Sequence, residues 1–251
     1  MLRKIIKIAA ISLCATALII ALPFKAQAEP KKLSKSIKVG DTVYFGRYEQ
    51  DGNDDNGKEK IEWQVLEKKG NKALLISKKV LDVKAYNKEY VDITWENSTI
   101  RKWLNKIFIN AAFNGKDKNK ISITTVENKD NTYGTKGGNS TKDKVFLLSI
   151  DEAYKYYKTD KERAANITEY TLGEAKRIGL EKEWFESEQE FNAWWEKHQS
   201  IYGWQWWYWL RSPGDDQDIA ARVFDDGDVY VNGYLVDFDS NGVRPALWVN
   251  L

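Results

Sequence analysis

The sequence predicts an α+β fold, in which strands and helices occupy different stretches of the chain. Short runs of β-branched and aromatic residues, separated by Gly, Asn and Asp, occur near the amino end and again after Gly203. Between them lie segments with apolar residues at helical spacing, and two of these begin with a Ser-x-x-Glu capping box. We therefore expect N-terminal strands and helices, followed by an irregular, antiparallel C-terminal sheet.

The first 28 residues have the pattern of a secretory signal peptide. Basic residues precede an apolar run from Ile8 to Leu22, and Ala26-Gln-Ala28 offers a small-residue cleavage site. A retained membrane anchor is the alternative, but the apolar run of about fifteen residues is shorter than the roughly 20 that span a bilayer. We expect cleavage near Ala28 and a secreted or cell-surface protein whose mature chain does not span the membrane.

Charge and cysteine content narrow the class of protein. The charged residues of the leader are all basic, and without them acids slightly outnumber bases. A chain with no basic surplus is not expected to bind nucleic acid. The single cysteine, Cys14, lies in the leader, so the mature fold depends on its core rather than on disulfides.

The mature chain is expected to hold a single domain, 39–251, preceded by a flexible Lys/Ser-rich leader, 29–38. Residues 42–48 and 61–66 are rich in β-formers and flank an Asp/Asn/Gly cluster, which predicts a hairpin. A third strand is predicted at 73–77.

The first predicted helix begins after Ser98, which acts as its N-cap. Its apolar residues recur at the i, i+3, i+4 and i+7 spacing of one buried face. They are Ile100, Trp103, Leu104 and Ile107.

The middle of the chain combines a long polar loop with buried elements. Residues 129–144 are predicted to be a mobile loop, and 144–148 a buried strand. The capping box 149–152 then starts a helix, and a further helix is expected over 167–178. A second capping box, 187–190, opens a short helix whose apolar side is predicted to carry Phe191, Trp194 and Trp195.

After Gly203 the pattern is entirely that of strands separated by turns. The predicted strands are 206–211, 220–224, 229–231, 234–238 and 246–249.

Four tryptophans and a tyrosine crowd into residues 204–209. Strand alternation would give two apolar faces, so we expect a central strand packed on both sides. One face carries Trp206, Tyr208 and Leu210, and the other carries Trp207, Trp209 and Arg211. Trp204 precedes this strand and is a candidate for an exposed ring that stacks on a sugar or a peptide.

Arg211 and Arg244 each lie beside a turn or a proline on a tryptophan-bearing strand. Each is either a structural clamp that bonds loop carbonyls and carboxylates or a ligand-binding residue. The single histidine, His198, has no second histidine or cysteine beside it, so a surface or packed imidazole is expected rather than a zinc site.

The C-terminal turns are rich in aspartate, which either closes the turns or supplies a pair of catalytic carboxylates. These residues are Asp215, Asp216, Asp218, Asp225, Asp226 and Asp228. Asp237, Asp239 and Asn241 begin like a calcium loop, although Trp248 stands at its twelfth position, so a plain turn is the alternative. Asp51 begins a similar series, and there a hairpin tip is expected because no helices flank the loop.

Several blocks of the chain resemble the DUF6273 family of exported bacterial domains. They are FGRYEQD, GKEKIEWQVL, ALLIS, TWENSTIRKWLN, KVFLLSIDEA, WLRSPG and GVRPALWVNL. The family implies no established activity. Segment 179–203 is longer than the family leads us to expect, which suggests a tryptophan-rich insertion.

At the level of fold, WLRSPG and GVRPAL also resemble the C-terminal half of C-type-lectin-like domains, including relatives of the formylglycine-generating enzymes. This resemblance implies a late irregular sheet whose loops present a surface. The mature chain departs from those relatives because it has no catalytic cysteine, no lectin calcium triplet and no disulfides.

These observations predict a non-catalytic binding module at the outside of the cell, and the lectin resemblance suggests a carbohydrate ligand. The alternatives are a hydrolase that uses the Asp-rich loops, metal-free or with Ca²⁺, and a structural surface protein. No cofactor other than Ca²⁺ is a candidate. The candidate ligand-binding residues are Trp204, Arg211, Asp215, Asp216, Asp218, Asp225 and Arg244.

Overall fold

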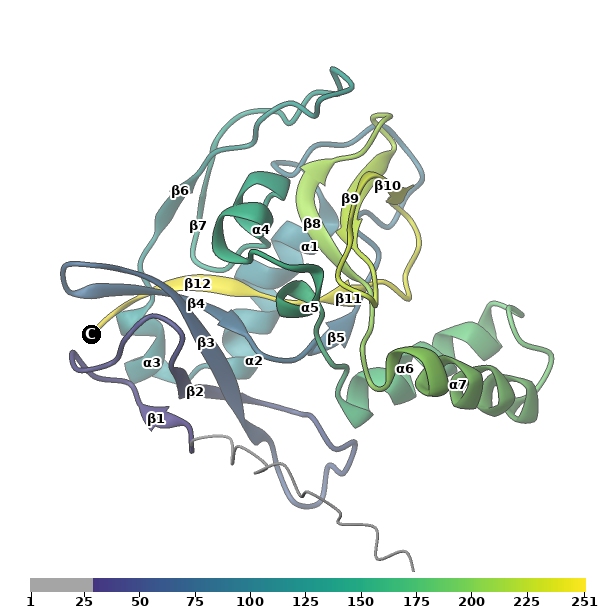
Figure 1. Ribbon diagram of the computed structural model, residues 1–251, viewed down its shortest axis with the longest axis horizontal. Helices are drawn as coiled ribbons and strands as arrows, with labels where there is room; N and C mark the ends of the chain where they lie inside the picture. The colour runs from purple at the N-terminus through teal and green to yellow at the C-terminus, as the bar shows by residue number, and fades with distance from the viewer. Residues whose placement is uncertain (1–28) are drawn as a thin grey trace, which may run out of the picture.

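The computed structural model describes residues 29–251, so the predicted signal peptide lies outside the described residues. Two five-stranded sheets and a two-stranded ribbon, with helices around them, share one buried core (Figure 1). The predicted α+β class is confirmed. Over this part of the chain, no helix combines the length and the apolar character that a membrane span requires.

The first sheet has the order β1-β2-β3-β4-β12 and contains the predicted hairpin and third strand. Its pairs are antiparallel except for β1 with β2. The strands are β1 (Lys31–Lys32), β2 (Thr42–Tyr48), β3 (Glu59–Lys69), β4 (Lys72–Ser77) and β12 (Ala246–Asn250).

The segment 29–38, for which the composition predicts a flexible leader, is joined to this sheet. Strand β1 pairs with β2, and Ile37 is only 1% exposed. Lys31 Nζ also donates to Asp41 at 2.7 Å. The burial of Ile37 and the pairing of β1 with β2 hold this segment against the sheet despite its polar composition. The ordered part of the chain therefore begins before Val39.

The first helical region begins after Ser98, whose hydroxyl accepts from the Arg101 amide as predicted. It consists of α1 (Thr99–Trp103), a π-helical turn η1 (Leu104–Phe108) and α2 (Ile109–Ala112). The π-helical turn adds a residue to the helical repeat and rotates the following side chains. The prediction that Ile107 faces the core is therefore wrong, since Ile107 is 53% exposed and Phe108 is buried.

The long loop predicted to be mobile is tied to the second sheet. Residues 129–140 lie between the ribbon strands β6 (Thr124–Val126) and β7 (Thr141–Asp143), after α3 (Gly115–Lys120). Strand β7 itself falls within the predicted loop, 129–144, so that prediction is wrong for its last residues. Asn131 Nδ2 donates to the carbonyls of Pro213 and Val231 at 2.7 and 2.9 Å. The side-chain amide of Asn131 therefore holds the loop against the second sheet, although the loop is polar and glycine-rich.

Residues 145–148 are buried as predicted, but they form an extended segment rather than a strand. Their sheet pairing is a single bridge between Phe146 and Ala246. Helix α4 (Ile150–Tyr156) follows with the predicted reciprocal capping box, and α5 (Asp160–Arg163) has a second one.

Helices α6 (Glu169–Glu181) and α7 (Glu188–Tyr202) lie side by side and project from the two sheets (Figure 1). Trp194 and Trp195 turn toward the body of the protein, where their rings pack against Trp206 at 5.8 and 5.9 Å. Helix α7 has 15 residues and is longer than predicted.

The second sheet has the order β10-β9-β8-β11-β5, so β8 is central as predicted. It begins at Tyr208, however, and the prediction that Trp206 and Trp207 lie on opposite faces is wrong, since they precede the strand and their rings stack at 4.4 Å. The strands are β5 (Asp82–Val83), β8 (Tyr208–Pro213), β9 (Ile219–Val223), β10 (Val229–Leu235) and β11 (Gly242–Val243).

Two features of the predicted C-terminal sheet differ in the structure. The last strand, β12, belongs to the first sheet, and β11 pairs in parallel with β8, so the second sheet is mixed rather than purely antiparallel. The two strands predicted at 229–231 and 234–238 are one strand, β10, with a register shift between Tyr230 and Tyr234. Gly233 lies in this bulge with a φ of +82°, which a glycine adopts without strain.

Arg244 lies where the chain crosses from β11 to β12, and it is buried. Its Nε donates to the Ser77 carbonyl at 2.9 Å, and Nη1 donates to the Arg163 carbonyl at 2.8 Å. It also donates to the hydroxyls of Tyr208 and Tyr157, at 3.0 and 3.3 Å. This one side chain therefore joins β4, α5, β8 and the end of α4.

Substitution of Arg244 by Met should lower the free energy of unfolding by about 3 kcal/mol or more, because it leaves buried acceptors without donors. Arg177→Met is a matched control, since Arg177 forms exposed ion pairs on α6 that contribute about 0.5 kcal/mol. Urea denaturation measures the free energy of unfolding of both variants. Equal losses of stability would contradict the central role of Arg244.

Gly227 packs against α5 so closely that a Cβ atom would meet the Asp160 carbonyl oxygen at 1.8 Å. Its φ is +92°. We expect Gly227→Ala to cost about 3 kcal/mol of stability through strain and overpacking together.

Gly57→Ala separates these two causes, because Gly57 has a similar φ of +79° and open space around it. We expect Gly57→Ala to lower the free energy of unfolding by about 1 kcal/mol. If the two variants lose the same stability in urea, the close approach to α5 is not what constrains Gly227.

Candidate functional site

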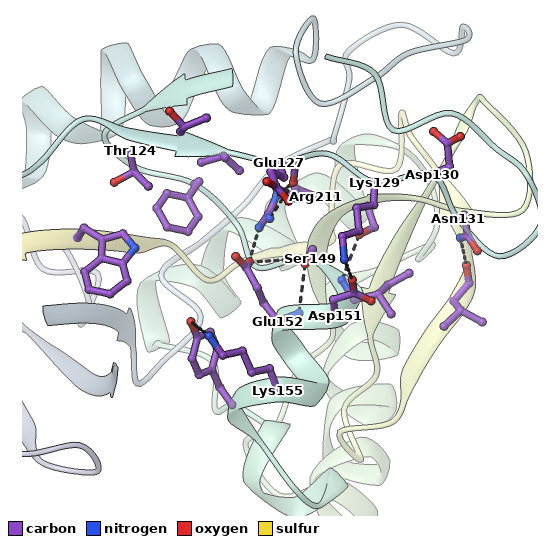
Figure 2. A pocket seen from close by; sticks show the side chains of 18 of the residues that line it. Thr124, Glu127, Lys129, Asp130, Asn131, Ser149, Asp151, Glu152, Lys155 and Arg211 are labelled. Atoms are coloured by element: carbon purple, nitrogen blue, oxygen red, sulfur yellow. Dashed lines mark hydrogen bonds and ion pairs between the residues drawn. The ribbon is translucent and has the colours of Figure 1, made fainter. Parts of the chain in front are cut away.

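A pocket of about 750 Å³ lies where the two sheets meet, beside the start of α4 (Figure 2). We call it the α4 pocket. The first sheet contributes Lys69, Lys72 and Trp248, and the second contributes Arg211 and Val231. Strand β6 and the loop after it cover one side, and the first turns of α4 form the other.

Arg211 crosses the base of the pocket from β8 and is almost fully buried. Its guanidinium donates to the Leu147 carbonyl at 2.8 Å, to the Glu127 carbonyl at 3.0 Å and to the Glu152 carboxylate. Arg211 therefore links β8, the loop after β6 and the start of α4. Its fork of donors is largely used within the protein, which is the geometry of a clamp.

Glu152 has two roles at the same place. As the third residue of α4 it accepts from the backbone amide of Ser149 at 3.0 Å, which completes the capping box. It also accepts from Arg211. Figure 2 shows the hydrogen bonds that join Glu152 to Arg211 and to Ser149. A carboxylate held by a helix terminus and a guanidinium is fixed in orientation.

A second fixed group lies at the far end of α4. Lys155 Nζ donates to Glu67 at 2.8 Å, and the Tyr156 hydroxyl donates to the same carboxylate at 2.5 Å. Burial alone would raise the pKa of Glu67, but these hydrogen bonds outweigh it and lower the pKa to about 2. Glu67 is therefore ionised at neutral pH and serves as an anchor for the two α4 side chains, not as a proton donor.

Aromatic rings form much of the apolar lining. Phe146 is buried, and Trp248 and Tyr156 are half-buried. Trp248 points outward from β12 because its neighbours Leu247 and Val249 point into the core. The ammonium of Lys69 lies 5.6 Å from the centroid of the Trp248 ring.

Ion pairs surround the opening. Lys129 Nζ lies 2.8 Å from Asp151, and Lys136 Nζ lies 2.7 Å from Asp130. Pairs this exposed contribute little to stability. These pairs place positively charged donors and negatively charged acceptors beside the aromatic lining.

The candidate residues from the sequence do not form one site. Arg211 lines the α4 pocket, but Arg244 lies in the interior, bonded to backbone carbonyls and tyrosine hydroxyls. Trp204 is 40% exposed and borders a separate groove that also includes Tyr44 and Glu169.

The aspartates fall into two groups at opposite ends of β9. Asp215, Asp216 and Asp218 precede the strand, and Asp225 follows it, so the groups are separated by about 20 Å of extended chain. A glycosidase pair needs a separation of about 5 to 10 Å. The two loops therefore do not supply one carboxylate pair.

Within these groups the carboxylates bond to nearby parts of the protein. Asp216 accepts from the backbone of Gln217 in its own turn at 2.7 Å, and Asp215 accepts from the side-chain amide of Asn232 on β10 at 3.1 Å. The carboxylate of Asp226, in the second loop, accepts from the backbone of Asp228.

Within the part of the chain that the structure describes, no third acid comes close enough to share an ion with the calcium candidates Asp237, Asp239 and Asn241. Asp239 lies 3.9 Å from Lys182, and Asn241 is fully buried. Among residues 29–251 the acids that come close enough to share an ion are Glu49, Asp51 and Glu59, at the hairpin tip. Their carboxylates accept from backbone amides of the same hairpin, as with Glu49 and Gly52 at 2.8 Å.

Sequence reasoning missed most of the α4 pocket. Trp248 was grouped with a strand, and Glu152 was identified only as a capping residue. One signal was present, because an outward-facing tryptophan between two apolar residues of a strand is a candidate for a partly exposed ring. Lys155 and Tyr156 gave no signal, since their role depends on Glu67 from another element.

No curated protein and no solved structure matches the chain. The lectin-like fold that its motifs suggest therefore stays a prediction. A family model described as "Domain of unknown function (DUF6273)" matches residues 70–251, and the chain belongs to that family.

Proposed function

We propose that the protein is an exported, non-catalytic binding module that takes a carbohydrate into the α4 pocket. The observation that carries this proposal is the half-buried Trp248 ring beside fixed ion pairs in one pocket. A sugar presents a C–H face that stacks on an aromatic ring and hydroxyls that both donate and accept. Export rests on the leader sequence, residues 1–28.

The state of the polar groups supports binding rather than proton transfer. Glu152 is engaged by Arg211 and by the helix terminus, and the pKa of nearby Glu67 is lowered. A general acid needs a raised pKa near the working pH. These carboxylates are suited to accept hydrogen bonds in a fixed direction, which favours recognition over hydrolysis.

Trp248→Ala should reduce glycan binding about tenfold, because it removes the ring on which the sugar stacks. The measurement is binding of the purified protein to a glycan array, followed by calorimetry with the best glycan. Since Trp248 is only half-buried, we expect the variant to remain folded.

Trp204→Ala is the matched control, because Trp204 is an exposed tryptophan in the separate groove. It should bind as the wild type does. Loss of binding in this variant alone would place the glycan in the other groove, and an array without any signal would favour a structural surface protein. Cleavage of the bound glycan, with or without Ca²⁺, would favour the hydrolase alternative.

A further inference from the structure

We propose that the protein has a second ligand site, in which Arg222 binds the carboxylate of a small molecule with an aromatic or apolar body. The site is a pocket of about 490 Å³ on the outer side of β9 and β10, next to the end of α7. We call it the Arg222 pocket. It shares no residue with the α4 pocket.

Arg222 is 91% buried, with 9% of its surface exposed, yet no described residue accepts a hydrogen bond from its guanidinium or pairs with its charge. Its Nε is a buried donor without a partner. This sets it apart from Arg211 and Arg244, whose donors are used within the protein. Burying an unpaired cation is costly, so such a residue is retained more readily where a ligand supplies the missing charge.

Two aromatic rings hold the guanidinium in one orientation. Its Cζ lies 4.8 Å from the ring centroid of Phe224 and 4.2 Å from that of Tyr234. Phe224 follows Arg222 by two residues, directly after the end of β9, and Tyr234 pairs with Ala220, two residues before Arg222. The rings therefore flank the guanidinium on both sides, and a ligand meets the N–H groups at its edge. This geometry suits a planar carboxylate.

Trp207 forms a wall of the same pocket. Its ring is fixed by stacking on Trp206 at 4.4 Å, and its Nε1–H is buried away from the cavity. The Nη groups of Arg222 are therefore the donors that meet the ligand. An ionised carboxylate, which only accepts hydrogen bonds, is the matching group.

The remaining walls define the body of the ligand. Tyr202 and Phe238 extend the aromatic lining begun by Phe224 and Tyr234. Asp225 and Asp226 stand at the same pocket and disfavour a ligand with several negative charges. A monocarboxylate with an aromatic or apolar body fits both conditions.

Asp225 lies between His198 and the Arg222 pocket, with His198 Nδ1 3.7 Å from its carboxylate. Among the described residues, Asp225 forms no hydrogen bond or ion pair with Arg222. Burial lowers the pKa of Arg222, and the nearby charge of Asp225 only partly opposes this shift. The donors of the guanidinium therefore stay available to a ligand.

The test adds three probes of similar size to the purified protein and follows binding by tryptophan fluorescence, to which Trp207 in the pocket contributes, and by calorimetry. They are 3-phenylpropionate, L-phenylalanine and L-phenylalaninamide. The first two carry the carboxylate and should bind, and the amide should bind at least tenfold more weakly. Equal binding of the amide, or no binding by either carboxylate, would overturn the proposal.

Arg222→Met separates a ligand-binding from a structural arginine. Methionine fills similar space between the rings without a charge, so the melting temperature should stay the same or rise, and carboxylate binding should fall at least tenfold. A melting temperature lowered by several degrees would show that Arg222 stabilises the fold instead.

Trp248→Ala in the α4 pocket is the matched control and should leave carboxylate binding unchanged. Glycan binding by Arg222→Met should likewise equal that of the wild type. If the glycan does not bind, the conclusion about the carboxylate site therefore still holds, and the reverse is also true.

Discussion

The structure depends on one buried cation, Arg244, at the crossing between its two sheets. Its acceptors are the carbonyls of Ser77 and Arg163 and the hydroxyls of Tyr157 and Tyr208. None is a carboxylate, so the charge is stabilised only while all of these neutral groups converge on it. The same contacts fix the end of α4 relative to β8, and these two elements wall the α4 pocket. The scaffold and the site are thus held by the same interaction.

Of the four arginines buried among residues 29–251, three occupy three different electrostatic situations. Arg211 has a carboxylate and backbone carbonyls, Arg244 has only neutral acceptors, and Arg222 has two aromatic rings and no acceptor among the described residues. Sequence reasoning singled out the first two because each lies beside a turn or a proline on a tryptophan-bearing strand. It passed over Arg222, since nothing local distinguishes an arginine that has partners from one that lacks them. Only the folded neighbours, Phe224 and Tyr234, make this distinction.

Local rules predicted the elements well and their assembly less well. The capping box at Ser149, the hairpin and the two-sided burial of β8 were all predicted, because each depends on residues close in sequence. The exposure of Ile107 was missed, since a π-helical turn leaves no mark in apolar spacing. The place of β12 in the first sheet was missed as well, because strand order is set by contacts distant along the chain. The separation of the aspartates by β9, in contrast, follows from strand geometry and could have been foreseen.

Both pockets are formed before any ligand arrives, and this bears on how strongly they can bind. The loop over the α4 pocket has the composition of a mobile segment, yet Asn131 ties it to β8 and β10. The Arg222 pocket is walled by Tyr202 at the end of α7, and that helix is held to the body by the packing of Trp194 against Trp206. A ligand that enters a formed pocket does not have to order its walls, so less of its interaction energy is lost. Helix α7 therefore contributes its last residue, Tyr202, as one wall of the pocket that Arg222 and Tyr234 line from β9 and β10.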